Sequence, residues 1–525
     1  MTHSISFIVE GPSLSREVPS TTVSQLIRDQ ARRCPQRVAL IEASSGRDLT
    51  YAALDRLIGR FAAGLAANGF KPGDTLLMVA PNLPEWPIAA LGALAAGGVV
   101  SGANPMCDAD ALAHQMSDAN ARFAFTIPPF LDIVREAAAK AGCNNVILLG
   151  EAESTLSFAA LLACQDPEPT PVRDADALAA LPYSSGTTGL PKGVVLPHRN
   201  LVSNVCQFMQ ARPTDETAVV LAVLPMFHIY GFTVVTLRAL ASGATIVTLP
   251  RFEPESFLTA IERYRVSHLL LVPPLMHFLA QHPMVEARDL SSLVHIGCGA
   301  APLGAATEQG VAEKLKCSVG QGFGMTESSG VVATSYPDRA RSGASGQLLP
   351  GTQARVVDVT TGADLPRGAT GEIWFRGPQA FKGYLNQPDA TAATLTADGW
   401  VRSGDIGYFD DDGYLFITDR LKELIKVKGF QVAPAELEAL LFTHPSVADV
   451  AVIARPDQRA GEVPVAYVVG RGPFDPDEVK AWVAQRVIEY RQLADVVSCD
   501  SIPKTPSGKL LRRALRALDA QRSTR

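Results

Sequence analysis

The chain has 525 residues, enough for several folding units with buried cores, so a mini-protein or a disulfide scaffold is excluded. Its 47 Lys and Arg against 53 Asp and Glu give a net charge of -6, which leaves no excess positive charge to neutralise a nucleic-acid backbone. Hydrophobic residues make up 47% and charged residues 19%, which excludes a disordered chain and is typical of a globular enzyme.

Up to about residue 345, predicted helices alternate with short apolar strands. Helical periodicity marks residues 23–33, 51–68 and 108–119. Apolar runs predict strands at 75–80, 123–127, 146–149, 218–224, 244–249, 269–272 and 294–297. This alternation predicts an α/β fold class, with parallel sheets covered by helices.

The pattern changes near residue 347. Short strands between Gly, Asp and Pro turns predict a small antiparallel β unit or barrel at about 346–418. From Arg420 onward an α+β pattern predicts a separate small domain, with helices at 434–441 and 476–490 and strands at 447–454 and 464–469. We therefore expect a large N-terminal domain, residues 1–418, and a smaller C-terminal domain, residues 419–525.

Several features bear on location and redox state. The start has neither the basic flank nor the apolar run of a signal peptide, and the QRSTR end is no lipidation or peroxisomal signal. The apolar stretch 86–103 is rich in Ala and Gly and predicts a buried helix followed by a buried strand, not a membrane span. The eight cysteines are scattered and fit free buried thiols. We expect a cytoplasmic protein without a membrane span.

The segment 183–193, YSSGTTGLPKG, has the composition of a phosphate-binding loop. It places four Ser/Thr hydroxyls, three glycines and one lysine directly after a predicted strand. Glycine lets the backbone approach oxyanions, hydroxyls and amides donate to them, and lysine adds a mobile charge. The spacing is not that of GxxxxGK[ST]. We therefore expect a polyphosphate ligand held by a different kind of loop.

This loop resembles the signature of the adenylate-forming superfamily, which includes acyl-CoA and aryl-CoA ligases, peptide-synthetase adenylation domains and luciferase. Further motifs follow in the same order: LPMFHIYG at 224–231, GCGAAPL at 297–303, GQGFGMTES at 320–328, GEIWFRG at 371–377, the segment 400–438, and PKTPSGKLLRR at 503–513. The resemblance covers residues 20–520 approximately and lies nearest to the 4-coumarate-CoA ligases. It implies an AMP-forming acid–CoA ligase that uses ATP, Mg²⁺ and, as a substrate, CoA.

The resemblance assigns most motif residues to ATP. The β- and γ-phosphates are implied to contact Ser184, Ser185, Gly186, Thr187, Thr188, Gly189 and Lys192. Adenine, ribose and α-phosphate are implied to contact Ala300, Gln321, Gly322, Phe323, Thr326, Asp405 and Arg420, with Lys422 and Lys426 facing the acyl-adenylate. Glu327 is implied to help hold Mg²⁺.

The remaining implied roles concern catalysis, CoA and the acid. Lys509 would act as an electrostatic clamp between carboxylate and α-phosphate, Thr326 would donate to that phosphate, and His228 would gate the thioester step. Asp419 occupies the hinge position, so the small domain is expected to be mobile between half-reactions. The implied CoA contacts are Arg251, Lys428 and Gly429, and the implied acyl-pocket residues are His228, Tyr230, Gly297, Gly299, Ala300, Gly330 and Val331.

The identity of the acid stays open at this point. Small pocket residues favour a bulky or flat apolar acid, but Gly297, Ser329 and Trp374 depart from plant coumarate ligases. An aryl acid of the hydroxycinnamate type and a medium-chain fatty acid are both compatible with the sequence. The alternatives are an enzyme that loads a carrier protein or stops at acyl-AMP, a luciferase-type oxygenase, and a non-catalytic nucleotide-binding protein. A monomer and a homodimer are both possible, and no nucleic-acid partner is expected.

Overall fold

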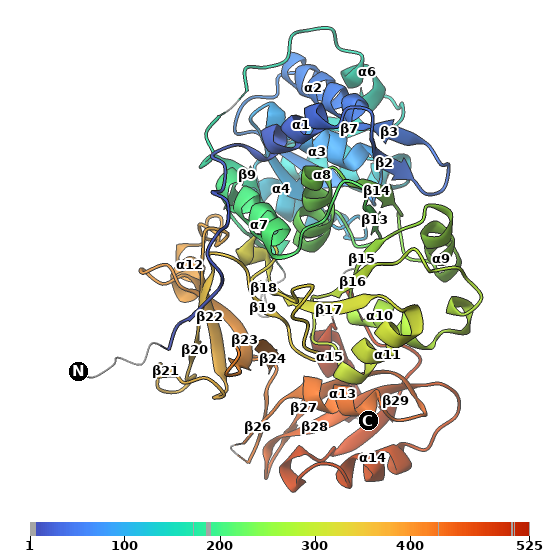
Figure 1. Cartoon of the computed structure of the whole chain (residues 1–525), viewed down its shortest axis with the longest axis vertical. Helices are drawn as coiled ribbons and strands as arrows, with labels where there is room; N and C mark the ends of the chain where they lie inside the picture. Colours follow the sequence, from blue (N-terminus) through green and yellow to red (C-terminus); the bar gives the residue numbers. More distant parts are fainter. Residues whose placement is uncertain are drawn as a thin grey trace.

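Two helix-covered sheets, a β unit and a C-terminal unit make up the fold shown in Figure 1. The computed structural model describes residues 7–171, 173–184, 191–428, 430–505, 508 and 510–523. The predicted Ser185, Gly186, Thr187, Thr188, Gly189, Gly429 and Lys509 lie outside the described residues.

The first sheet has seven strands in the order β12-β9-β5-β4-β6-β7-β8. They are parallel except for the antiparallel pair of β12 and β9. The strands are β4 Thr75–Val79, β5 Val99–Gly102, β6 Ala121–Thr126, β7 Asn145–Leu148, β8 Leu156–Ser157, β9 Leu178–Ala180 and β12 Leu196–Pro197. The associated helices are α2 Tyr51–Ala67, α3 Glu85–Ala95, α4 Ala109–Asp118, η1 Pro128–Phe130, α5 Leu131–Ala141 and α6 Phe158–Leu162.

The second sheet has nine strands in the order β19-β18-β17-β16-β15-β13-β14-β2-β3, with a parallel centre from β17 to β2. The strands are β2 Val38–Glu42, β3 Asp48–Thr50, β13 Val219–Ala222, β14 Thr245–Thr248, β15 His268–Leu271, β16 His295–Cys298, β17 Ser318–Phe323, β18 Ala333–Thr334 and β19 Gln347–Leu348. Its helices are α1 Val23–Arg33, α7 His198–Ala211, the π-helix η2 Tyr230–Leu237, α8 Arg238–Ser242, α9 Pro254–Arg263, α10 Pro273–Gln281, η3 Pro283–Val285, α11 Ala305–Leu315 and η4 Thr326–Ser328. A separate hairpin pairs β10 Tyr183–Ser184 with β11 Lys192–Gly193.

The β unit is an open antiparallel sheet, in the order β1-β20-β22-β23-β24 with β21 beside β20. Residues alternate between buried and half-buried along β22, as expected for a strand with one face on a core. The sequence did not predict β1, which joins the sheet from the far end of the chain. The elements are β1 Val9–Glu10, β20 Gln353–Val357, β21 Asp364–Leu365, β22 Gly371–Arg376, α12 Pro388–Thr394, β23 Val401–Phe409 and β24 Leu415–Arg420.

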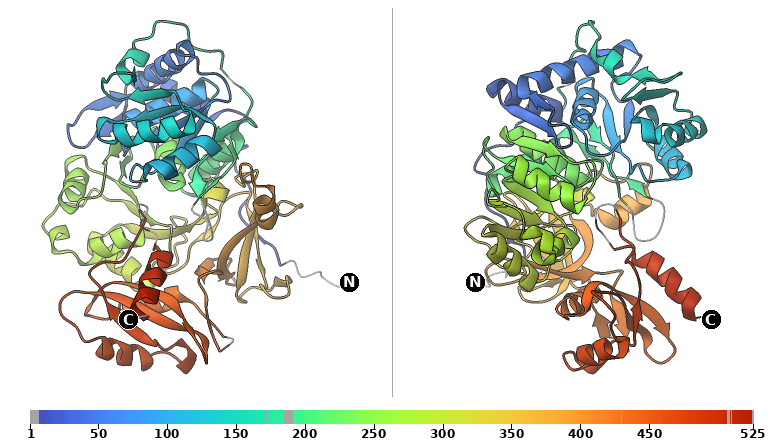
Figure 2. Two further views of the ribbon diagram at one scale, coloured as in Figure 1. Left: turned by 180° about the vertical axis from the view of Figure 1, so that it is seen from behind. Right: turned by 90° about the vertical axis from the view of Figure 1, so that its right-hand side faces the viewer.

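The C-terminal unit has a sheet in the order β26-β25-β28-β27, with β29 beside β28. Helices α13 and α14 pack on one face and α15 on the other, because alternate residues of β27 contribute to two separate cores; Figure 2 shows this from the side. The predicted boundary at Asp419 stays a prediction, although β24 and β25 belong to different sheets. The elements are β25 Ile425–Val427, β26 Phe430–Val432, α13 Pro434–Leu441, β27 Val447–Asp457, β28 Gly461–Gly470, α14 Pro476–Ala484, η5 Glu489–Arg491, β29 Asp495–Ser498 and α15 Arg512–Ser523.

Most predicted elements agree with the structure, and one helix needs correction. Helix α14 ends at Ala484 instead of 490, because the chain turns there and brings Leu493 into the core. Lys422 lies in a turn, and Lys426 lies within β25, where the buried Ile425 and Val427 alternate with it. The expected helix and strand within 86–103 are confirmed as α3 and β5.

Two further predictions concern the cysteines and the apolar helices. All eight cysteines are free thiols, of which Cys34, Cys143 and Cys298 are buried and the others half-buried. In the part of the chain that the structure describes, no helix combines the length and the apolar character needed to cross a bilayer.

We predict that Glu438→Gln destabilises the C-terminal unit by about 3 kcal/mol, because it leaves the buried guanidinium of Arg512 without its anionic partner. Both oxygens of Glu438 lie 2.7 Å from Arg512 Nη2, and the two side chains are only 10% and 13% exposed. The matched control is Glu436→Gln on the same helix, which breaks an exposed pair with Arg491 and should change stability by less than about 1 kcal/mol. Urea unfolding of both variants checks this, and equal effects would contradict it.

Candidate active site

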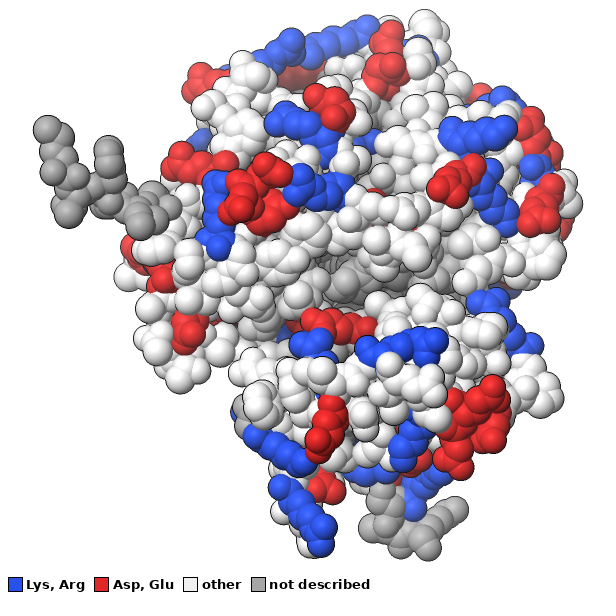
Figure 3. Space-filling model, turned by 60° about the horizontal axis from the view of Figure 1, so that its bottom comes forward, with Lys and Arg blue, Asp and Glu red and all other residues white. Residues whose placement is uncertain are grey.

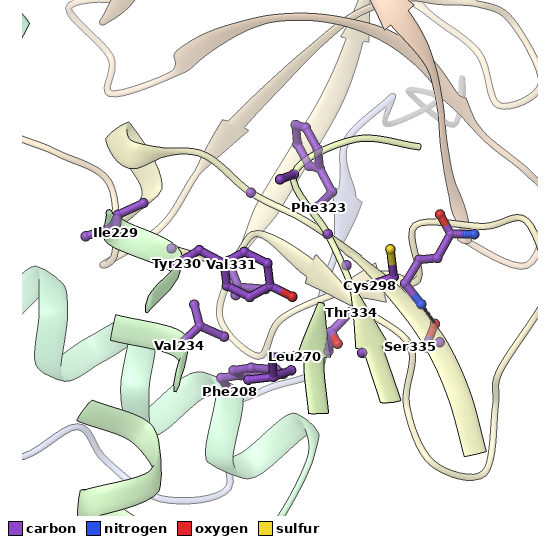
Figure 4. Close-up of a pocket in the computed structure, with 18 of the residues that line it drawn as sticks. Phe208, Ile229, Tyr230, Val234, Leu270, Cys298, Phe323, Val331, Thr334 and Ser335 are labelled. Atoms are coloured by element: carbon purple, nitrogen blue, oxygen red, sulfur yellow. Dashed lines mark hydrogen bonds between the residues drawn. The ribbon is translucent and has the colours of Figure 1, made fainter. Parts of the chain in front are cut away.

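A cavity lies where the parallel strands β15, β16 and β17 meet the helices η2 and α7. Its empty space is about 620 Å³, including the open mouth. Figure 4 shows the side chains that line it, which come from η2 (Tyr230, Val234), α7 (Phe208), β15 (Leu270) and the segment after η4 (Val331). Ligands bind at the carboxyl ends of parallel strands, so this position fits a binding site.

Glycines along β16 and β17, which have no side chains, leave the space of the cavity open. Gly297 pairs with Gly320 in the parallel register. A Cβ on Gly320 would lie 2.6 Å from Ser335 Cβ, and one on Gly299 would lie 3.3 Å from the ring of Tyr230. The predicted pocket residues His228, Tyr230, Gly297, Gly299, Ala300, Gly330 and Val331 all line this cavity.

The loop that carries His228 is held by a residue that sequence reasoning missed. Asn82 Nδ2 donates to Ala222 O and Leu224 O, both at 2.9 Å, and Met226 N donates to Asn82 Oδ1 at 2.8 Å. His228 Nδ1 accepts from Tyr230 N at 3.2 Å. The position of Asn82 three residues after the end of the buried strand β4 was the signal available in the sequence.

A second group of polar residues lies where the hairpin β10–β11 meets η4. Glu327 is 5% exposed and accepts from Tyr384 Oη at 2.7 Å and from Ser184 Oγ at 3.3 Å. Lys192 Nζ lies 5.0 Å from the centre of the Tyr384 ring. The structure thus brings together the predicted Ser184, Lys192 and Glu327, and adds Tyr384, which sequence reasoning missed.

The donors around Glu327 suit a divalent cation that arrives with its nucleotide. A carboxylate and hydroxyls are hard oxygen donors, and Mg²⁺ commonly uses one or two carboxylates together with substrate phosphates. Among the described residues, no group of three or more His, Cys, Asp and Glu could form a protein-only metal cage. These oxygen donors therefore fit Mg²⁺ bound together with a nucleotide.

The predicted nucleotide residues have distinct surroundings. Gln321, Gly322 and Phe323 line the cavity, but the Gln321 side chain is turned toward Leu303 and Glu308, with Nε2 2.7 Å from Glu308 Oε2. Its main chain is bonded to Ser335, since Gln321 N donates to Ser335 Oγ at 3.1 Å and Gln321 O accepts from Ser335 N at 2.9 Å. Thr326 begins η4, beside Glu327 and largely buried.

Asp405 and Arg420 face each other across β23 and β24. They are register partners, and Arg420 Nε lies 3.2 Å from Asp405 Oδ1. The carboxylate is 7% exposed and the guanidinium 36%, so the pair has a buried acidic end and a solvent-facing basic end.

The cationic residues predicted for CoA and acyl-adenylate are not gathered at the cavity. Lys422 and Lys426 are exposed, and Lys428 Nζ lies 3.3 Å from Glu489 Oε1 on the surface of the C-terminal unit. Arg251 is 82% exposed and pairs with Glu253 at 2.5 Å. Their roles stay predictions.

The C-terminal unit contacts the N-terminal part through α10. The His277 and Phe442 rings stack at 4.2 Å, and Arg471 Nη2 lies 2.5 Å from Gln281 Oε1. Gly508 has φ +80°, and a Cβ there would lie 2.8 Å from Val272 Cγ2, so this position requires glycine. Figure 3 shows the hollow between the two parts, on a face where basic and acidic side chains are interspersed.

Comparisons with known proteins identify the family. Residues 27–385 match the model of the AMP-binding enzymes, and residues 436–509 match the AMP-binding enzyme C-terminal domain. The 4-coumarate–CoA ligase 2 of Petroselinum crispum is 41% identical over 491 residues, which cover 91% of this chain and 90% of the relative. The crystal structure of ATP-bound MatB from Rhodopseudomonas palustris has a TM-score of 0.86 at 30% identity and covers 94% of this chain and 98% of its own.

The chain belongs to the AMP-binding, adenylate-forming family. Within it, the chain is a member of the AMP-forming acid–CoA ligases, as the resemblance implied. The fold agrees with the anthranilate CoA ligase AuaEII in complex with anthranoyl-AMP, which has a TM-score of 0.91 at 22% identity and covers 97% of this chain and 99% of its own. The predicted α/β fold class is confirmed.

Asp419 links the β unit to the C-terminal unit. Its Oδ1 accepts from Arg420 N at 2.6 Å, and its Oδ2 accepts from Ala435 N at 2.9 Å. Burial raises the pKa of this carboxyl to about 6, against the opposing influence of Arg512 and the two N–H donors.

We predict that Asp419 makes the free energy of unfolding depend on pH. Because its pKa in the folded state lies above its ordinary value of 3.8, protonation stabilises the fold below about pH 4, and this contribution is lost as the pH rises through 6. Between those limits the free energy of unfolding of Asp419→Asn, relative to the parent, should rise by about 3 kcal/mol. Urea unfolding from pH 4 to pH 7 measures it; a pH-independent difference would contradict the assignment.

Proposed function

We propose that this protein is an ATP-dependent ligase that activates a hydroxyaryl acid of the hydroxycinnamate type and transfers the acyl group to CoA. Family membership supports adenylation and thioester formation, because a curated relative is named 4-coumarate–CoA ligase and a similar structure is described as ATP-bound. The observation that carries the choice of acid is the polar end of the cavity, formed by His295.

His295 lies deep in the cavity. It is the first residue of β16, whereas Gly299 follows the last residue, and four residues of strand span roughly 13 Å. Its Nδ1 lies 3.1 Å from Ser318 O, and because a carbonyl only accepts, Nδ1 carries the proton. Burial, followed by nearby Arg212, lowers the pKa of the ring well below its ordinary value, so the ring is neutral and Nε2 is an acceptor.

An acid with a hydroxyl at its far end matches this acceptor. Nε2 lies 3.4 Å from the point where a Gly297 side chain would begin, so it borders the open side of the strand. A medium-chain fatty acid has no donor there, and an unpaired buried acceptor costs about 1–3 kcal/mol. A phenolic hydroxyl would donate to Nε2 while its ring packs against Phe208, Tyr230 and Val331.

The proposed reaction has two steps. The acid's carboxylate attacks the α-phosphorus of ATP, the bond to pyrophosphate breaks, and acyl-AMP forms. The sulfur of CoA, after loss of its proton, then attacks the acyl carbon and displaces AMP. Mg²⁺ bound at Glu327 would neutralise phosphate charge in the first step.

The residues divide between these two steps. Ser184 and Lys192 would bind the outer phosphates and Asp405 the ribose hydroxyls, which an ionised carboxylate can accept together. Lys509 would neutralise charge between carboxylate and α-phosphate. His228 would gate the thioester step, and residues 419–525 would swing about Asp419 between the two steps.

A pyrophosphate-release assay tests the function. Aryl and fatty acids are supplied with Mg·ATP, with and without CoA, and AMP and thioester are followed by mass. CoA-dependent thioester from hydroxyaryl acids is the expected result. Acyl-AMP made regardless of CoA would favour carrier loading, a preference for fatty acids would refute the acid class, and no turnover would refute the proposal.

We predict that His295→Leu removes discrimination for the far hydroxyl. The parent should use 4-coumarate over cinnamate by about tenfold or more in kcat/KM, because a site built to bind a hydroxyl rejects its analogue. The ratio should approach one in the variant. The matched control is His268→Leu, on the neighbouring strand with its ring centre 6.3 Å away, where the ratio should persist. An unchanged ratio in His295→Leu would contradict this role.

We predict that Lys509→Ala slows adenylation at least about 100-fold, because it removes the charge placed at the developing transition state. Thioester formation from supplied acyl-AMP should continue at a similar rate. Separate assays of pyrophosphate release and of acyl-AMP consumption measure the two steps. Normal acyl-AMP synthesis by the variant would refute the clamp.

A further inference from the structure

Tyr384 contacts two of the residues predicted to bind Mg·ATP. Its hydroxyl donates to Glu327 Oε1 at 2.7 Å, and its ring face lies 5.0 Å from Lys192 Nζ. Lys192 leaves the loop on β11, whereas Glu327 lies in η4, far away in the sequence. One half-buried side chain therefore contacts both a cation and an anion.

The backbone holds Tyr384 firmly in this position. Tyr384 forms an antiparallel bridge with Val194, directly after β11. Leu385 N donates to Gly193 O at 2.8 Å, and Val195 N donates to Gly383 O at 2.9 Å. The Tyr384 N–H donates to Thr391 Oγ1 of α12 at 2.9 Å. The ring is thus fixed from both the β unit and the exit of the phosphate loop.

Glu327 depends on neutral donors for its placement. Within the ranges that the structure describes, the hydroxyls of Tyr384 and Ser184 contact its carboxylate, and no Lys or Arg forms an ion pair with it. A buried carboxylate without a basic partner is unfavourable until a cation reaches it. The phenol has one O–H group, and at 2.7 Å from the Glu327 carboxylate it acts as the donor.

Tyr384 acts on Lys192 in a different way, through its ring. A lysine side chain is a flexible stem with a point charge, so it loses rotamer freedom when it meets a phosphate. Contact with the face of an aromatic ring restricts the ammonium group before any ligand arrives.

We infer that Tyr384 is a positioning residue for Mg·ATP, which orients the Glu327 carboxylate through its hydroxyl and the Lys192 ammonium through its ring. The inference rests on the proposed function, because it presumes that ATP and Mg²⁺ bind here. The hydroxyl and the ring have separable effects, which makes the inference testable.

Calorimetric binding of ATP in Mg²⁺ and in EDTA, on the full chain, separates the two effects. Tyr384→Phe keeps the ring and should weaken binding of Mg·ATP about fivefold while changing ATP binding in EDTA less than twofold. Tyr384→Leu loses both contacts and should weaken binding about fivefold or more in both conditions. Tyr384→Met replaces the leucine variant if that protein does not fold.

Tyr414 supplies the matched control. Its hydroxyl donates to Arg339 O at 2.9 Å and its ring lies 4.1 Å from the Arg341 guanidinium, so it combines the same two contacts in the β unit away from the cavity. Tyr414→Phe and Tyr414→Leu should bind ATP like the parent in both conditions. Unfolding temperatures of all variants report any general loss of structure.

The outcomes are distinct. Parent-like binding of Mg·ATP by Tyr384→Phe, an equal loss in EDTA, or the same losses in the Tyr414 pair would overturn the role of Tyr384. A parent protein that binds no Mg·ATP would overturn the proposed function and this inference with it. Parent binding together with the split between Mg²⁺ and EDTA would support both.

Discussion

The parallel register of β16 and β17 is the constraint on which the site depends. Gly297 lies opposite Gly320 and Cys298 opposite Gln321, so two motifs that are distant in the sequence begin at one edge of the sheet. The glycines leave the space for the cavity, and the chain that continues from β17 forms η4, which carries Glu327. The acid end and the phosphate end of the site are therefore both set by this one pair of strands.

Under the proposed function, the β unit would supply the other half of the same site. Asp405 and Arg420 come from paired strands of its sheet, and Tyr384 comes from the connection between β22 and β23. Through the backbone bonds between 193–195 and 383–385, this unit holds the exit of the phosphate loop. The connection that carries Tyr384 and the strand that carries Lys192 are thus fixed relative to each other by hydrogen bonds.

Sequence reasoning succeeded where the signal was local. The bounds of α1 and α13 follow from helical periodicity, and motif residues such as Tyr230 and Gly299 line the cavity as expected. It failed where the signal was long-range. β1 pairs with a strand more than 300 residues away, and the partnership of Tyr384 with Glu327 exists only after folding. Nothing in local composition distinguishes such residues, because their neighbours in space are distant in sequence.

The glycine-lined wall of the cavity has an evolutionary consequence. Positions 297, 299 and 320 already carry the smallest residue, so any mutation at them adds atoms to the cavity. Under the proposed function, a side chain at 299 would narrow the range of acids, whereas one at 320 would clash with Ser335 Cβ at 2.6 Å and strain the fold. Widening it requires changes on the opposite side, at larger residues such as Phe208 or Tyr230, which also pack against the core. Drift in substrate range is therefore biased toward smaller acids.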